Sequence, residues 1–215
     1  MYRKLFRHEK GITGLETAII LIAFVVVAAV FAYTALSAGL FATQKAQEAV
    51  YSGLKEAQST LELRGGIIAT ANTTGDLGTI KQISFTVANV LGGAPIDFTP
   101  PTADNNTGIA KSGSTNKVVI SYIDQYQKVN NLFWAVTPLG NDNDNNLLEQ
   151  NEKFQITVGD TSSTANAGGN LINALSTHVL GANTIFTLEV VGPTGAILQI
   201  ERTTPPTVDQ IMNMR

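Results

Sequence analysis

The side chains best suited to chemistry in this sequence are oxygen ligands gathered in one short stretch. Residues 141–146 read Asn-Asp-Asn-Asp-Asn-Asn, and Glu149 and Glu152 follow closely. Alternating carboxylate and amide oxygens in a loop match the preference of a hard cation such as Ca²⁺, although the glycine and the distant glutamate of an EF-hand loop are missing. Solvated Asn/Asp turns also occur without metal. The sequence therefore predicts either a calcium site at Asp142, Asp144 and Glu149 or an ordinary turn.

The sequence gives little support for catalytic chemistry. There is no cysteine, which excludes a thiol nucleophile, a disulfide and a zinc–thiolate site. His8 and His178 are the two histidines, and His178 stands beside Val179 and Leu180, a setting typical of a surface or packing residue. The net charge of −3 gives no basic footprint for nucleic acid. We predict a protein that is not an enzyme, requires no cofactor and does not bind nucleic acid.

Two sequons offer sites for covalent modification. They are Asn72-Thr73-Thr74 and Asn105-Asn106-Thr107, and both fall in stretches rich in turn residues. Asn72 and Asn105 are therefore candidate glycosylation sites if the segment is exported. Because Asn and Thr are abundant in this chain, chance occurrence is the alternative.

The N-terminal quarter of the chain contains a long apolar segment without charged residues. From Thr17 to Gln44 the chain has 28 residues without a charge, longer than the roughly 20 apolar residues that a membrane span needs. The basic residues ahead of it predict an N-terminus held in the cytoplasm. The apolar run is too long for a secretory signal peptide, whose apolar stretch has about 7 to 15 residues. A single-pass anchor that carries an outer domain is the simplest reading of this pattern.

The helix is expected to continue beyond the apolar run. Val50, Leu54, Ala57 and Leu61 recur at helical spacing, which predicts one helix that reaches Leu63. Glycine tolerates the left-handed turn that ends a helix, so Gly65-Gly66 marks its expected end.

The remainder of the chain has the pattern of an all-β domain. Short segments alternate apolar and polar residues and are separated by turn-rich stretches, which predicts an antiparallel sandwich of the immunoglobulin-like kind. The predicted strands lie at 83–87, 117–123, 132–136, 153–158, 184–191 and 196–201. Trp134 is expected in the core, and 171–180 fits either a short helix or an irregular strand. The fold class is α+β, with a long N-terminal hydrophobic helix before the sandwich.

Three segments of the chain have the pattern of a known family. Lys10-Gly11 is followed by Ile12-Thr13-Gly14-Leu15-Glu16, which is similar to the class III leader of the type IV pilin-like superfamily. The helix ETAIILIAFVVVAAVFAYTALSAGLF and the tail FTLEVVGPTGAILQIERTTPP resemble those of the archaellins, the flagellins of archaea, within that superfamily. The resemblance implies cleavage after Gly11 and three parts: a leader at 1–11, an assembly helix at 12–63 and an outer β domain at 64–215. An acid at Glu16, fifth after the cut, follows the pilin pattern, which many archaellins lack.

The resemblance also implies a function and partners. It points to a non-enzymatic subunit of a secreted, rotating swimming filament at the cell surface, a helical polymer of this chain that could include sister subunits. A prepilin-like leader peptidase, a membrane assembly platform and an ATPase are the implied partners, and the membrane holds the precursor. A non-rotating adhesive pilus and a membrane-anchored binding ectodomain are the alternatives.

Glu16 has two readings on physical grounds. An unpaired carboxylate inside an apolar bundle costs several kcal/mol, so the new ammonium of Ile12 after cleavage could neutralise it and set one axial register. Alternatively, Glu16 is solvated at the membrane interface, near the helix N-terminus whose dipole favours an acid.

Overall fold

The computed structural model describes residues 9–58, 60–90, 93–141, 143–159 and 168–214, and within the long helix it describes the side chains of 14–57. The chain divides into two compact units, Met1–Ser52 and Gly53–Arg215, which are described separately below.

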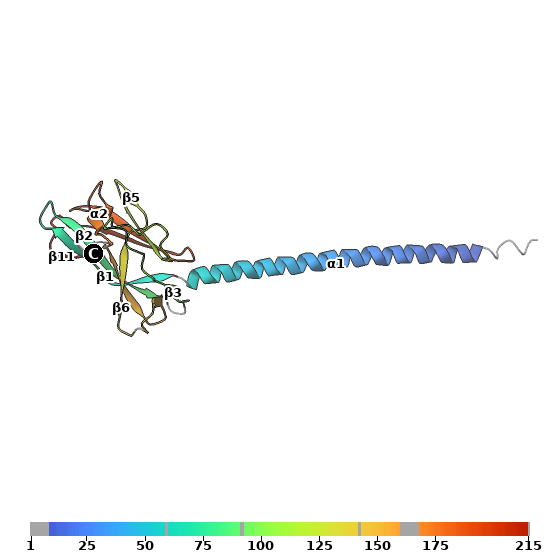
Figure 1. Ribbon diagram of the computed structural model, residues 1–215. Helices are drawn as coiled ribbons and strands as arrows, with labels where there is room; N and C mark the ends of the chain where they lie inside the picture. Colours follow the sequence, from blue (N-terminus) through green and yellow to red (C-terminus); the bar gives the residue numbers. More distant parts are fainter. Residues whose placement is uncertain (1–8, 59, 91–92, 142, 160–167, 215) are drawn as a thin grey trace, which may run out of the picture. The chain divides into compact units, whose positions relative to one another are not determined.

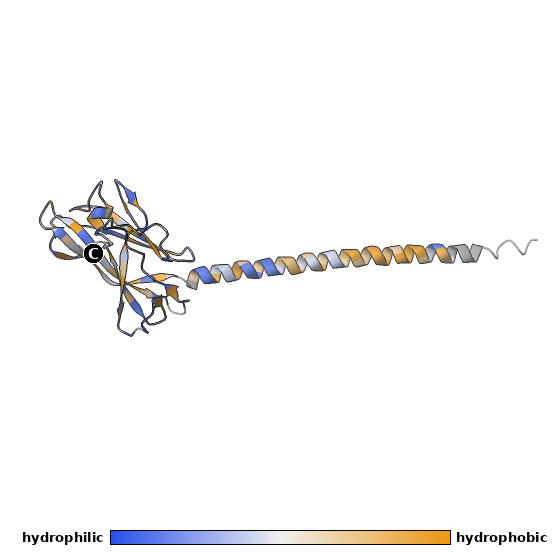
Figure 2. Ribbon diagram, viewed as in Figure 1, coloured by the Kyte–Doolittle hydropathy of each residue, from blue (hydrophilic) through white to orange (hydrophobic). Residues whose placement is uncertain are grey.

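Helix α1, Glu9–Gln58, is a single helix of 50 residues. Every described side chain from residue 14 to residue 57 is exposed, including the large apolar ones. Figure 2 shows that the apolar residues dominate its N-terminal part, while polar residues are interspersed toward its C-terminal end. By length and composition the segment Gly14–Ala57 could cross a membrane. The helix therefore has no core of its own.

The predicted end of the helix at Leu63 is wrong. Helix α1 stops at Gln58, and strand β1 occupies Leu61–Thr73. Leu61, the fourth member of the helical stripe, is a buried strand residue that pairs with Asn89. Gly65-Gly66 does not end a helix but lies where the β1–β2 register shifts, and Gly65 has a φ of +83°. Because glycine serves a bulge as readily as a helix end, its presence alone did not distinguish the two.

The β unit consists of two main antiparallel sheets (Figure 1). The five-stranded sheet has the order β11 (Ile211–Met214), β1, β2 (Thr79–Asn89), β8 (Lys153–Val158) and β6 (Trp134–Leu139). The four-stranded sheet has the order β10 (Ile197–Thr203), β9 (Ile185–Val191), β4 (Val119–Asp124) and β5 (Lys128–Val129). Two short strands, β3 (Ile96–Asp97) and β7 (Leu147–Leu148), pair with each other, and helix α2 spans Leu171–Ala174.

One cluster of buried side chains drawn from both sheets forms the core of this unit. Trp134 is fully buried, as predicted, and Phe98 packs edge-on against it and against Phe154, with ring centroids 5.9 and 6.0 Å apart. Strand β8 alternates buried residues with one exposed and two partly buried residues, so that one face of the sheet supplies the core. Each of the six predicted strands overlaps an observed strand, and the α+β class is confirmed. The undecided segment 171–180 begins with the short helix α2.

Candidate functional site

The apolar helix satisfies several of its own polar side chains. The hydroxyls of Thr17, Thr34 and Thr43 donate to the carbonyl oxygens three residues earlier, at distances of 3.0, 3.0 and 2.8 Å. An unbonded hydroxyl would be costly in lipid or in a dry helix bundle, and bonding to the same helix removes that cost. These threonines therefore do not interrupt the apolar surface of the helix.

Large apolar side chains project from the helix on all sides. Phe24 and Phe31 are 73 % and 71 % exposed, and Leu36 is 65 % exposed. Full burial of such a side chain is worth about 1.5–3 kcal/mol relative to water. A helix that is apolar all round is stable only in lipid or inside a larger assembly. The N-terminal unit therefore needs a partner to cover it.

The cleavage residues lie at the start of this helix. The Gly11–Ile12 peptide is in the first turn of α1, whereas the side chains of Lys10 and Ile12 lie outside the described residues. Glu16 is described and exposed, about one turn further along.

The Asp/Asn stretch forms a turn whose described acids already have partners. The amide of Asn143 donates to the Glu149 carboxylate at 3.1 Å, and the carboxylate of Glu152 accepts the backbone N–H of Glu149 at 2.9 Å. Asp144 takes a left-handed conformation with φ +62°. Asp142, the third predicted ligand, lies outside the described residues. Within the described part of the chain, no three His, Asp or Glu side chains converge on one point.

Both sequons are accessible. Asn72 is exposed near the C-terminal end of β1, and its Thr74 is exposed as well. Asn105 is exposed in a turn, where it has a φ of +45°, and its Thr107 is also exposed. Both acceptor positions are therefore open to solvent.

A hairpin in the four-stranded sheet carries two perturbed ionisable groups. Burial and a 2.9 Å hydrogen bond to Asp124 raise the pKa of Tyr122 far above its usual value. Burial alone would raise the pKa of Asp124, but its four hydrogen bonds, from Tyr122, Tyr126 and Gln127, together lower the pKa. The arrangement closes the β4–β5 turn and is structural.

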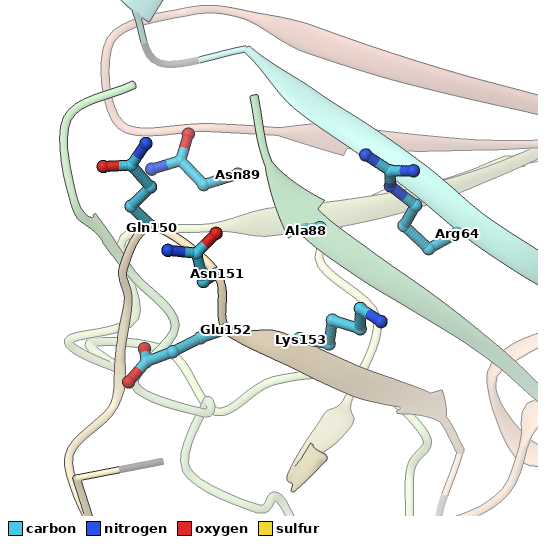
Figure 3. Close-up of a pocket in the computed structure, with 7 residues that line it drawn as sticks. All are labelled: Arg64, Ala88, Asn89, Gln150, Asn151, Glu152 and Lys153. Atoms are coloured by element: carbon cyan, nitrogen blue, oxygen red, sulfur yellow. The ribbon is translucent and has the colours of Figure 1, made fainter. Parts of the chain in front are cut away.

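A polar depression that the sequence did not predict lies at the base of the β1–β2 hairpin (Figure 3). We call it the basic depression; its volume is about 350 Å³, and its residues are Arg64, Ala88, Asn89, Gln150, Asn151, Glu152 and Lys153. These residues come from three distant parts of the chain and meet because β2 pairs with both β1 and β8. No local motif marks them, since their proximity depends on strand pairing alone.

The comparisons with known proteins agree along the whole chain. The sequence model of the archaeal-type flagellin family matches residues 11–202. Probable flagellin 1 of Archaeoglobus fulgidus is 39 % identical over 217 residues, which cover 99 % of this chain and 98 % of that protein. Probable flagellin 2 of the same organism is 40 % identical over 210 residues, or 95 % and 94 % of the two chains. The structure of the archaeal flagellum of Methanospirillum hungatei is similar with a TM-score of 0.58 and 29 % identity, covering 94 % of this chain and 98 % of that chain.

Proposed function

Since the chain belongs to the archaeal-type flagellin family and is a structural, non-enzymatic subunit of the archaellum filament, we propose how it reaches that filament. It is stored in the membrane through α1 with its N-terminus inside, it is cut between Gly11 and Ile12, and it then polymerises through the same helix. The observation that carries this proposal is the helix itself, whose described side chains are all exposed and mostly apolar.

Cleavage by a prepilin-like peptidase is supported by the position of the Gly11–Ile12 peptide. The first turn of a helix has N–H groups without intrahelical acceptors, so it unwinds more easily than the interior. A peptidase that needs an extended substrate could therefore open this turn without disturbing the rest of α1.

The leader proposal is tested by N-terminal sequencing of filaments sheared from cells. We expect the subunit to begin at Ile12. The Gly11→Asp variant should remain uncut, stay in the membrane fraction and give no filaments. Filaments built from an uncut Gly11→Asp chain would contradict the proposal, and His8→Asp is the control, because it adds an acid to the leader without changing the cleavage peptide.

Membrane storage also explains why assembly needs outside energy. Lipid already shelters the apolar side chains of α1, so moving the helix from lipid to a bundle gains far less than moving it from water. A membrane platform with an ATPase would supply the difference, and it would also drive rotation. Deleting the subunit should abolish swimming; retained swimming with lost surface attachment would instead indicate an adhesive role.

We also propose that Glu16 is neutralised in the filament by the Ile12 ammonium of its own or a neighbouring subunit. An unpaired charge in an apolar bundle costs several kcal/mol. The Glu16→Ala variant leaves the ammonium without its partner, so filament yield should fall, and Glu16→Gln separates charge from shape. Normal yield and normal filament order in both variants would favour the solvated position at the membrane interface.

Glycosylation of Asn72 and Asn105 and calcium binding by Asp142, Asp144 and Glu149 are further proposals. Mass spectrometry of the filament subunit, compared with Asn72→Gln and Asn105→Gln variants, tests the first. Calorimetric titration of chelator-treated filaments with Ca²⁺ tests the second, with Asp144→Asn as the variant. An ordinary turn, held by the bonds to Glu149 and Glu152, predicts no heat of binding.

A further inference from the structure

We infer that the basic depression receives the tip of the β1–β2 hairpin of a second copy of this chain, which links outer β units head to tail. The inference rests on polymerisation through α1 and adds a specific contact outside the helix. The acidic tip is defined as the turn Gly75–Gly78, which contains Asp76 and Leu77, together with neighbouring Asp209.

One hairpin carries both surfaces at opposite ends. Its base is the Leu61↔Asn89 pair, next to the basic depression, and its turn follows the Thr73↔Thr79 pair. At about 3.3 Å per strand residue, the two ends are roughly 30 Å or more apart. Two different surfaces that bind each other across such a distance form a heterologous contact, which extends into an open polymer when rotation does not close it into a ring. The geometry thus suits a filament.

The depression contains an acceptor that lacks a donor. Asn89 is 8 % exposed, and its amide nitrogen donates to the carbonyls of Ala94 and Leu148 at 2.7 and 3.4 Å. These two bonds fix which end of the amide is nitrogen, so the other end is the oxygen. That oxygen, Oδ1, is buried without a hydrogen-bond partner. Because this atom has almost no accessible surface, a docked turn does not reach it, and the Asn89 amide serves only as a fixed part of the lining of the depression.

The charges around the depression favour an acidic occupant. In Figure 3 the amides of Asn89, Gln150 and Asn151 gather on one side, while Arg64 and Lys153 lie on the other. The carboxylate of Glu152 points away from both cations and accepts the Glu149 N–H. Arg64 is paired at 2.8 Å with Glu62, and the Arg64 side chain remains 55 % exposed. Lys153 is exposed, with no ion pair to the described acids.

The acidic tip is held rigidly in an exposed position. Gly75 and Val208 exchange two backbone hydrogen bonds of 2.8 and 3.0 Å, and the Gly78 N–H donates to Gly75 at 3.0 Å. The Thr207 hydroxyl donates to the Asp76 carboxylate at 3.0 Å. Leu77, at the centre, is 94 % exposed, the largest value among the exposed large apolar side chains described. A tip ordered before binding loses little conformational entropy when it docks.

The two surfaces match in two ways. The carboxylates of Asp76 and Asp209 complement the cations of the depression, Arg64 and Lys153. Leu77 would cover Ala88 and the aliphatic parts of the long side chains around it. A single exposed leucine is common in proteins, so the charge match carries the inference.

Because the native chain has no cysteine, this contact can be tested by cross-linking. Filaments of a Leu77→Cys, Gln150→Cys chain are treated with a short bis-maleimide and separated on a denaturing gel. Leu77 is in the turn of the hairpin and Gln150 lies in the depression beside the base of the hairpin, so a cross-link joins different subunits. We expect a ladder extending beyond the dimer. The matched control, Leu77→Cys with Gln199→Cys on the outer face of β10, should stay monomeric on the gel.

Electron microscopy of the same samples separates this inference from the function. Filaments that form normally but give no Leu77–Gln150 ladder would overturn the docking contact and leave the filament role intact. Exchanging the charges of the acidic tip and the basic depression tests the docking contact independently. Asp76→Lys and Lys153→Asp should each lower the temperature at which filaments dissociate, and the double variant should restore at least half of the loss; no restoration would overturn the contact.

Discussion

The two units of this molecule differ in where their apolar side chains lie. In the helix, every described side chain from residue 14 onward is exposed, whereas the β unit buries a continuous cluster that includes Trp134, Phe154 and Phe186. The helix is the more apolar of the two by composition, with 28 consecutive uncharged residues, but the β unit has a large apolar surface as well. The physical difference between them is whether that surface is covered by the same chain. The β unit completes its own core, and the helix leaves that task to lipid or to other copies.

Removing the helix should have the largest effect on this contrast. A fragment of residues 60–215 is expected to fold alone, because none of its core residues comes from the helix. It should be monomeric in size-exclusion chromatography and unfold cooperatively in urea, while a fragment of residues 12–58 should aggregate without detergent. A 60–215 fragment that is unfolded would show that the β unit depends on α1.

The second-largest difference between the two units is expected when one phenylalanine is replaced in each. Phe154 is 1 % exposed, and Phe154→Ala should lower the free energy of unfolding of the β unit by about 3–5 kcal/mol. Phe24 is 73 % exposed, and Phe24→Ala should change that free energy by less than about 0.5 kcal/mol. Urea denaturation of both variants in detergent checks this. Equal losses would contradict the independence of the two units.

The same glycine substitution should have opposite signs in the two units. Gly169 has a φ of +81°, and an added Cβ would lie 2.4 Å from the Asn106 backbone, so Gly169→Ala should cost about 1–3 kcal/mol. Gly39 lies in the helix, and an added Cβ there has nothing within 4 Å, so Gly39→Ala should stabilise the helix by about 0.5–1 kcal/mol. Thermal unfolding followed by circular dichroism measures both. A destabilising Gly39→Ala in detergent micelles would contradict the prediction.

The smallest expected effect concerns pH and belongs to the β unit alone. The pKa of Asp124 is lower in the folded chain than in the unfolded chain. Its contribution to the free energy of unfolding is therefore fully present above the unfolded pKa of about 3.9 and is lost as pH falls through the folded pKa. The pKa of Tyr122 is raised, so its contribution is lost as pH rises above about 10. Asp124→Asn should make the free energy of unfolding depend less on pH in acid solution. It should also lower that free energy by about 1 kcal/mol at neutral pH.

The matched control for this profile is Glu201→Gln, at an exposed position of β10. Because Glu201 has no described side-chain partner, its variant should follow the native profile. An unchanged acid limb in Asp124→Asn would show that the turn bonds contribute nothing to the pH dependence.

Sequence patterns predicted the helices and strands that a contiguous stretch of residues specifies by itself. The 28-residue uncharged run predicted α1, and alternation predicted the strands at 153–158 and 184–191. The end of α1 was predicted too late in the chain because Leu61 continues a helical spacing. In the structure Leu61 belongs to β1 and pairs with Asn89 of β2. Strand β11 was missed because its four residues are too short for a clear alternation, and its pairing with β1 fixes it.

The candidate sites divide in the same way. Gly11 and Glu16 were identified from a contiguous motif, and Trp134 from its place in an apolar strand. Arg64, Asn89 and Lys153 form one depression only after three strands pair, so no window along the chain contains them together. Whether an acceptor such as Asn89 Oδ1 lacks a donor is a property of the folded surroundings, and residue type does not reveal it.

The inward bonding of Thr17, Thr34 and Thr43 has a mechanical consequence. Hydroxyls whose proton is donated within their own helix cannot donate to an adjacent helix, so neighbouring helices meet mainly through apolar contacts that tolerate small axial slips. We expect a core of such helices to bend and to change its supercoil under torque without breaking hydrogen bonds donated by these threonines. Replacing these threonines with asparagine, whose amide cannot be hidden so fully, should stiffen the filament, as persistence lengths measured on electron micrographs would reveal.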